Sequence, residues 1–265
     1  MRMKSIASGS SGNVTYVGSD RAHILVDAGV SKKKIEEGLL DLDLSGRDVD
    51  ALFITHEHAD HIGGLGVWLR KYPVPVYATE DTIEAIKQGN GMGKVDWNLF
   101  FPIDKETDIY IKDICVQAFS VPHDAADPVA YRFCCDGKTG AIVTDLGEYD
   151  EKILSHLRGL DVIYAEANHD VRMLQLGPYP YSLKQRILGN HGHLSNESCG
   201  RFLCEVLHDQ IKCISLNHLS SHNNLPELAY EAVRLEIEMS ETKYRGDDFK
   251  IMVAKRSEPS ETVEF

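Results

Sequence analysis

The segment Thr55-His56-Glu57-His58-Ala59-Asp60-His61 decides the fold. It follows the apolar run ALFI, which predicts a short buried strand ending at Thr55. His56 and His58 are two positions apart, so at the extended end of a strand they face the same side. Asp60 and His61 fall at the turn into the next helix. These four potential ligands could serve two metal ions, and burying them without a metal or hydrogen-bond partners would be costly.

The remaining chain predicts strands in its first half and alternating strands and helices later. The runs KSIAS, NVTYVG and AHILVD are typical of strands separated by turns. Helical periodicity predicts helices over residues 61–72, 80–89 and 226–239. This order favours an α/β (α+β) fold with two mixed sheets packed together and helices outside. We expect a single domain over residues 1–265, with 255–265 as a polar tail.

Composition excludes several classes of protein. The chain has 265 residues, is 43% hydrophobic and carries a formal net charge of −13. It is too apolar for a disordered chain, and no run of about 18 apolar residues could span a membrane. The N-terminus lacks a secretory signal, and six scattered cysteines without C-x-x-C favour reduced thiols, so we expect a cytoplasmic protein. The charge argues against a protein that coats nucleic acid, although bound metals could supply positive charge locally.

The pattern T-H-x-H-x-D-H-x-x-G, from Thr55 to Gly64, resembles the signature of the metallo-β-lactamase superfamily. Four further residues match the other motifs of that superfamily in the expected order. They are Asp27 at the end of AHILVD, His123 in SVPHDAADPVAYRF, Asp145 in AIVTDLG and His218 in SLNHLSSHNN. The resemblance implies a four-layer αβ/βα sandwich with the site where loops converge at one sheet edge.

The same resemblance implies a ligand set for two divalent metal ions. Asp145 would bridge the ions, and Asp27 would orient a ligand histidine. His/Asp ligands accept Zn, Mn or Fe. One ion would be held by His56, His58 and His123, and the other by Asp60, His61 and His218. Asp60 would also take part in catalysis.

Later motifs distinguish the branches of the superfamily. Tyr164-Ala165-Glu166-Ala167 is similar to the His-Glu-Ala-Thr segment of tRNA 3′-processing nucleases, and Gly192-His193-Leu194-Ser195 resembles a loop of phosphodiesterase branches. A non-ligand His193 can protonate a leaving alkoxide while Glu166 orients it, which suits phosphodiester chemistry. Asp145 and Glu166 are too close in sequence to hold the large insertion of RNase J-type enzymes.

The N-terminal run ASGSSGN, with GHLSNE and HLSSHNNLPELA further on, resembles the YycJ/WalJ group of small bacterial exonuclease-type proteins. Hydrogen-bond donors for a substrate phosphate could come from Ser10, Ser11 and Asn13, and we also expect Ser195 to contact the phosphate. A plain hairpin turn is equally consistent with the N-terminal run. The resemblance favours a nucleic-acid phosphodiesterase, specifically a 5′→3′ exonuclease on DNA linked to repair, with no membrane partner. A small-molecule phosphodiesterase, a thioester or lactone hydrolase, and a non-enzymatic regulatory protein remain alternatives.

Overall fold

The computed structural model describes residues 1–105 and 107–265, and this part of the chain divides into two compact units. The first unit comprises Met1–Ser120, Ala125–Gly137 and Lys255–Phe265. The second comprises Val121–Asp124 and Lys138–Ala254.

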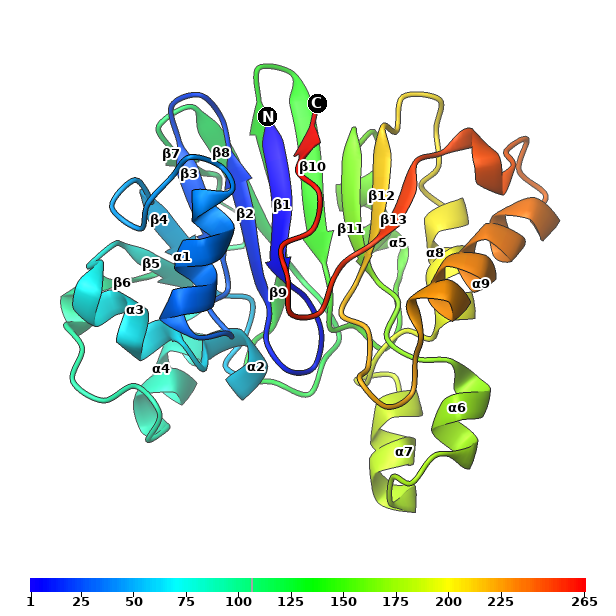
Figure 1. Cartoon of the computed structure of the whole chain (residues 1–265), viewed down its shortest axis with the longest axis horizontal. Helices are drawn as coiled ribbons and strands as arrows, with labels where there is room; N and C mark the ends of the chain where they lie inside the picture. Colours follow the sequence, from blue (N-terminus) through cyan, green and yellow to red (C-terminus); the bar gives the residue numbers. More distant parts are fainter. Residues whose placement is uncertain (106) are drawn as a thin grey trace. The chain divides into compact units, whose positions relative to one another are not determined.

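The first unit is built on a seven-stranded mixed sheet with the order β14-β1-β2-β3-β4-β5-β6 (Figure 1). Its N-terminal strands pair antiparallel from β14 to β3, and β3 to β6 run parallel. The parallel arrangement brings the carboxyl ends of β3 and β4 to one edge of the sheet. The strands are β1 Arg2–Ala7, β2 Val14–Gly18, β3 His23–Val26, β4 Ala51–Phe53, β5 Val76–Ala78, β6 Phe100–Pro102 and β14 Val263–Glu264.

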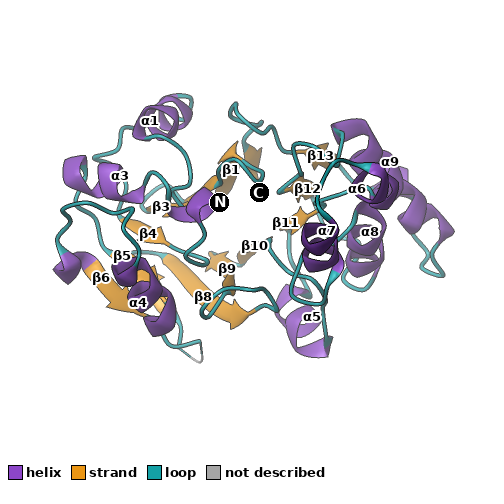
Figure 2. Ribbon diagram, turned by 90° about the horizontal axis from the view of Figure 1, so that it is seen from below, coloured by secondary structure: helices purple, strands orange, loops and turns teal. Residues whose placement is uncertain are grey.

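Alternating side chains of β4 pack on opposite faces of this sheet. Leu52 belongs to the core formed with the helices, whereas Phe53 meets Tyr131 edge-on with ring centroids 5.3 Å apart. Figure 2 shows α1 and α3 along one face of the sheet. The helices are α1 Lys32–Leu40, α2 Ala59–Ile62, α3 Leu65–Lys71, α4 Glu80–Gln88 and the 3-10 turn η1 Trp97–Leu99.

An antiparallel ribbon of β7 Ile109–Ile111, β8 Ile114–Ser120 and β9 Val129–Cys135 completes the first unit. It is tied to the end of β4, because the Tyr131 hydroxyl donates to the carbonyl of Ile54 at 2.7 Å. The Val129 amide also donates to the carbonyl of Thr55 at 3.1 Å. The residue that opens the histidine segment is therefore fixed from both the sheet and the ribbon.

The second unit contains the parallel strands β10 Lys138–Val143, β11 Val162–Glu166, β12 Cys213–Asn217 and β13 Ile251–Val253. They are paired in that order, so their carboxyl ends share one edge. Buried Phe202 and Val233 mark the apolar faces of two of its helices. The helices are α5 Glu151–Leu157, α6 Val171–Leu176, α7 Tyr181–Leu188, α8 Asn196–Cys204, α9 Pro226–Met239 and the 3-10 turn η2 Gly246–Asp248.

Two of the three predicted helices are confirmed, since α4 ends before Gly89 and α9 spans residues 226–239. The continuous helix predicted over 61–72 is wrong, because the chain breaks into α2 and α3 at Gly63-Gly64. A Cβ on Gly64 would lie 1.9 Å from the carbonyl oxygen of Val30, so this break is a close backbone contact that only glycine permits. The helical periodicity of the apolar residues continues through the glycine pair, so the sequence pattern does not predict the break.

The C-terminal residues 255–265, expected to be a polar tail, include β14, which pairs with β1. The amide of Ser260 also donates to the carbonyl of Ser5 at 2.8 Å. All six cysteines are free thiols. Among the described residues, no helix has the length and apolar character needed to cross a membrane.

Gly29→Ala tests the close packing of the β3 end against the histidine segment. A Cβ on Gly29 would lie 1.7 Å from the carbonyl oxygen of Asp60, so backbone must shift. We expect the substitution to lower the free energy of unfolding by about 1–3 kcal/mol, the range for overpacked sites. Thermal unfolding followed by circular dichroism measures this. Gly91→Ala is the control, because its Cβ meets nothing within 4 Å; equal melting temperatures for the two variants would contradict the account.

Candidate metal-binding and catalytic site

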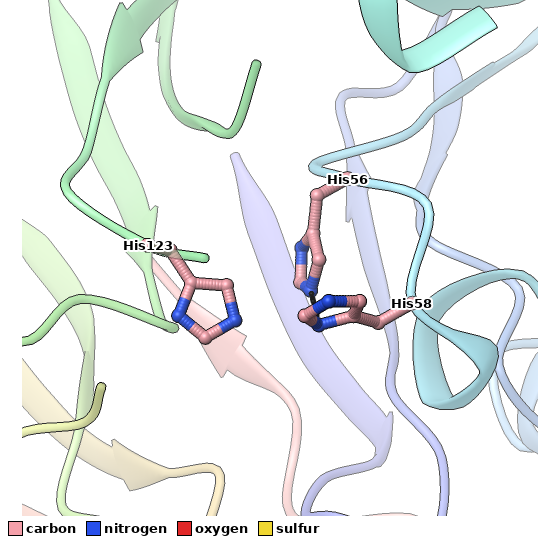
Figure 3. Close-up of side chains that lie close together, drawn as sticks. All are labelled: His56, His58 and His123. Carbon is pink, nitrogen blue, oxygen red and sulfur yellow. Dashed lines mark hydrogen bonds between the residues drawn. The ribbon is translucent and has the colours of Figure 1, made fainter. Parts of the chain in front are cut away.

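The histidine segment of the first unit points ring nitrogens at one another. Nε2 of His56 lies 3.1 Å from Nδ1 of His58, as the dashed line in Figure 3 marks. The rings of His56 and His61 are 4.1 Å apart at their centroids. His56 and His61 are buried, and Asp60 is partly exposed at the first turn of α2. Imidazole nitrogens and a carboxylate gathered in this way are the donors that Zn, Mn and Fe accept.

Asp27 fixes the orientation of this segment. Its carboxylate accepts from the Thr55 amide at 2.9 Å and from the Thr55 hydroxyl at 3.0–3.1 Å. It also lies 2.8 Å from Nδ1 of His61. A proton on Nδ1 leaves Nε2 of His61 as the lone-pair nitrogen, which is the tautomer a metal ligand needs. Asp27 is 3% exposed, so this carboxylate is held inside the protein.

The serine-rich turn lies beside the same segment. The side-chain oxygen of Asn13 accepts from the Gly9 amide at 2.8 Å, and its side-chain nitrogen lies 3.1 Å from Nε2 of His61. Asn13 is buried, whereas Ser10 and Ser11 are exposed at the tip of the turn. Asn13 therefore braces the turn against the histidine segment, and the two serines are the members of this set that face solvent.

Site residues of the second unit stand at strand ends in strained backbone. Asp145 follows β10 with φ +60°, and His218 follows β12 with φ +59°. In the first unit Asp27 follows β3 with φ +62°. Non-glycine residues rarely adopt this left-handed conformation, and such strain gathers at functional sites. Asp43, Lys112 and Asp136 also have a left-handed φ, so the conformation is shared with residues outside the predicted site.

Glu166, at the end of β11, is fully buried and gathers four donors. One carboxylate oxygen lies 2.8 Å from Nδ1 of His193 and 2.8 Å from Nδ1 of His218. The other accepts from the backbone amides of Leu146 at 3.2 Å and Leu194 at 3.1 Å. Single ligand atoms of Asp145, Glu166, His193 and His218 all lie within 4.8 Å of one another. The second unit thus brings together four of the predicted site residues.

The pair formed by Glu166 and His193 shifts both pKa values. Burial works against the charged forms of both groups, but their mutual attraction and hydrogen bond outweigh it. The pKa of Glu166 falls to about 2, and the pKa of His193 rises above its usual value. Glu166 is therefore a carboxylate, and His193 holds a proton on the nitrogen that faces it.

His123 and Ser195 complete the predicted residues of the second unit. Nδ1 of His123 lies 3.1 Å from the carbonyl of Gly192, which assigns the proton to Nδ1 and leaves Nε2 as the lone-pair nitrogen. Figure 3 draws this histidine with both ring nitrogens visible. Ser195 caps α8 by accepting from the Ser198 amide at 3.1 Å. Its hydroxyl is thus engaged in helix capping.

Sequence reasoning missed an asparagine network behind the second unit's site. The Asn168 side chain donates to the backbone carbonyl of His218 at 3.0 Å. The Asn224 side chain donates to the carbonyls of Ala167 and Asn168 at 2.9 and 3.0 Å. These buried amides hold the ends of β11 and β12 in place. The sequence feature that could have identified these asparagines is their place in the chain, because each follows a predicted site residue within a few positions.

Comparison with known proteins gives a family and close relatives. A model of the metallo-β-lactamase superfamily matches residues 7–182. Exodeoxyribonuclease YycJ of Bacillus anthracis is 42% identical over 234 residues, covering 88% of each chain. Exodeoxyribonuclease WalJ of Streptococcus pneumoniae is 40% identical over 246 residues, covering 93% of this chain and 91% of that one.

Solved structures agree on the fold. Zn²⁺-bound PqqB from Methylobacterium extorquens superposes with a TM-score of 0.75 at 15% identity, covering all of both chains. Yeast PDE1 superposes with a TM-score of 0.73 at 15% identity, covering 97% of this chain and 98% of that one. The structure has two mixed sheets flanked by helices. Together with these structural similarities, this confirms the predicted fold class, the αβ/βα sandwich.

Asp27→Asn tests whether this carboxylate sets the tautomer of His61. An amide cannot replace the charged acceptor of the Nδ1 proton, so we expect metal affinity to fall about 10- to 100-fold. Competition with a metal-binding dye measures it. Asp43→Asn is the matched control, because Asp43 also has a left-handed φ of +58° but is exposed. Unchanged affinity in the Asp27 variant would remove Asp27 from the metal site.

Proposed function

Because the chain belongs to the metallo-β-lactamase superfamily, we propose that it is a metal-dependent phosphodiesterase that degrades DNA from an end in the 5′→3′ direction. The hydrogen-bonded pair of Glu166 and His193, beside Asp145 and His218, is the observation that carries the proposal. A sugar alkoxide is a poor leaving group and needs a proton donor, which this pair supplies. The two relatives named exodeoxyribonucleases support the substrate.

We assign two divalent ions, Zn²⁺, Mn²⁺ or Fe²⁺, to the histidine and aspartate ligands. The donor chemistry fits, because the lone-pair nitrogens follow from the hydrogen bonds of His61, His123 and His218. Such ions, when bound, neutralise charge on a phosphate and lower the pKa of water. The proposed ligands of one ion are His56, His58 and His123, those of the other are Asp60, His61 and His218, and Asp145 is shared.

The protein side chains have distinct proposed roles. His193 is a catalytic residue that donates a proton to the leaving oxygen, and Glu166 is a positioning residue that acts through it. Asp60 is proposed as a ligand with a further catalytic part, and Asp27 as the orienting group for His61. Ser10, Ser11, Asn13 and Ser195 are proposed phosphate contacts, of which the exposed pair Ser10 and Ser11 are best placed to reach a substrate.

A smaller substrate is the second candidate. The net charge of −13 opposes binding of a long polyanion and favours a small phosphodiester, thioester or lactone. The deciding experiment offers metal-loaded protein 5′-labelled and 3′-labelled DNA and RNA, bis-p-nitrophenyl phosphate and a lactoyl thioester. Release of nucleotides from the 5′ end of DNA supports the proposal, and turnover of the thioester alone overturns it. We further propose that the protein acts in DNA repair in the cytoplasm.

Asp145→Asn tests the bridging assignment. The amide loses the charge shared by two ions, so we expect occupancy of both to fall together. Metal analysis of the purified variant by mass spectrometry measures the stoichiometry, and His218→Ala is the comparison expected to lose mainly one ion. Two ions per chain with full activity in the Asp145 variant would remove it from the site.

His193→Ala tests the proton donor. Cleavage of DNA should fall about 10²- to 10⁴-fold, the range for general acid catalysis. A p-nitrophenolate leaves without protonation, so bis-p-nitrophenyl phosphate should be cleaved at an appreciable rate, and metal content should be retained. Glu166→Gln should also reduce DNA cleavage more than cleavage of bis-p-nitrophenyl phosphate, but by a smaller factor. Equal losses on both substrates with metals retained would show that His193 binds phosphate without donating a proton.

A further inference from the structure

The helices α6 and α7 form a projection from the second unit. They lie at the end of the unit where the parallel strands finish (Figure 1). Residues 171–191, here called the α6–α7 arm, run directly from the β11 end to the loop that carries His193. Of the two helices only α6 contributes a buried side chain, Leu174, whereas α7 buries none. The arm therefore presents most of its surface to solvent.

The arm differs in charge from the rest of the chain. Between Asp170 and Glu197 the sequence contains no carboxylate side chain, while the whole chain carries a net charge of −13. Its cations are Arg172, Lys184 and Arg186. A polyanion that approaches this acidic protein thus meets no carboxylate on the arm itself.

Of these cations, Arg172 is the one that makes neither an ion pair nor a hydrogen bond with the described residues. Lys184 donates to the carbonyls of Gln175 and Gly177 at 2.7 and 2.8 Å and so closes the turn of the arm. Arg186 pairs with Asp124. Arg172 is exposed and makes no ion pair within residues 1–105 and 107–265. Its guanidinium is available to a phosphate.

The arm also carries two aromatic rings that solvent reaches. Tyr181 is 77% exposed at the start of α7. Tyr179 precedes it, and its ring lies 5.7 Å from that of exposed His222, with the hydroxyl 3.2 Å from the histidine Nδ1. Tyr179 is half-buried and Tyr181 is exposed. Aromatic rings that solvent reaches form the stacking platforms on which unpaired bases lie.

The arm is rigidly joined to the catalytic loop. The His193 amide donates to the carbonyl of Ile187, in α7, at 3.0 Å. The Gly192 amide donates to the carbonyl of Gly189 at 2.8 Å. A DNA strand bound to the arm would therefore be held at a set distance from the His193 side chain.

We propose that the α6–α7 arm binds the unpaired end of the DNA substrate, with bases stacked on Tyr179 and Tyr181 and a phosphate paired with Arg172. This inference rests on the proposed function and names the surface that holds the substrate. It explains how a protein of net charge −13 binds a polyanion through few contacts.

The test measures binding of an unpaired fluorescent oligonucleotide to metal-loaded protein by anisotropy, in Tyr181→Ala and Arg172→Ala. Loss of a stacking ring should weaken binding about 5- to 100-fold. Arg172→Ala should reduce the slope of log affinity against log salt by about 0.7, the value for one phosphate on a single strand. The controls are Tyr110→Ala, which is 68% exposed in the first unit, and Arg47→Ala, which is also exposed. Circular dichroism verifies that each variant folds.

The outcomes separate this inference from the proposed function. Tyr181→Ala should raise KM for DNA with little change in kcat, and the controls should behave as wild type. If both arm variants cleave DNA like the wild type and bind it with unchanged affinity, the inference is overturned and the proposed function stands. Binding by the arm without cleavage of DNA overturns the proposed function alone. A changed oligomeric state with unchanged DNA affinity would make the arm a protein interface and overturn the inference.

Discussion

The buried carboxylate of Glu166 is the group on which the second unit's site depends. It receives two histidine nitrogens and two backbone amides, and these come from the ends of three different chain segments. An isolated buried carboxylate would be costly, whereas four donors repay the loss of water. The two histidine contacts fix the ring orientations of His193 and His218. One interaction thus stabilises the fold locally and sets the chemistry of the histidines.

Asp27 plays the corresponding part in the first unit, where it holds Thr55 and His61. Both carboxylates stand at or directly after a strand end, where parallel strands deliver side chains to one edge. In each unit a carboxylate faces Nδ1 of a histidine, so Nε2 of His61 and of His218 is the nitrogen left for the proposed metal. Asp27, Asp145 and His218 share a left-handed backbone, a conformation that costs a non-glycine residue free energy.

Sequence alone predicted the two sheets and the helices with uninterrupted periodicity, such as α9. The motif residues were proposed through the resemblance to the superfamily signature, and their roles are tested by the substitutions given above. The break at Gly63-Gly64 escaped it, since the cause is a distant contact with Val30. β14 escaped it because its partner β1 lies at the other end of the chain. The support from Asn168 and Asn224 escaped it because buried hydrogen bonds leave no periodic pattern.

The central claim is that Glu166 holds His193 and His218 with their protons on Nδ1. Nitrogen-15 NMR of the histidine side chains in the metal-loaded protein reports the tautomer of each ring directly, with signals assigned through His193→Gln and His218→Gln. The account predicts a protonated Nδ1 in both rings. An unprotonated Nδ1 in either ring would contradict it, because Glu166 would then not orient that ring. A proton on Nε2 of His218 would also contradict it, because that nitrogen could not bind a metal, whereas His193 carries a proton on Nε2 in the acid form that donates to the leaving oxygen.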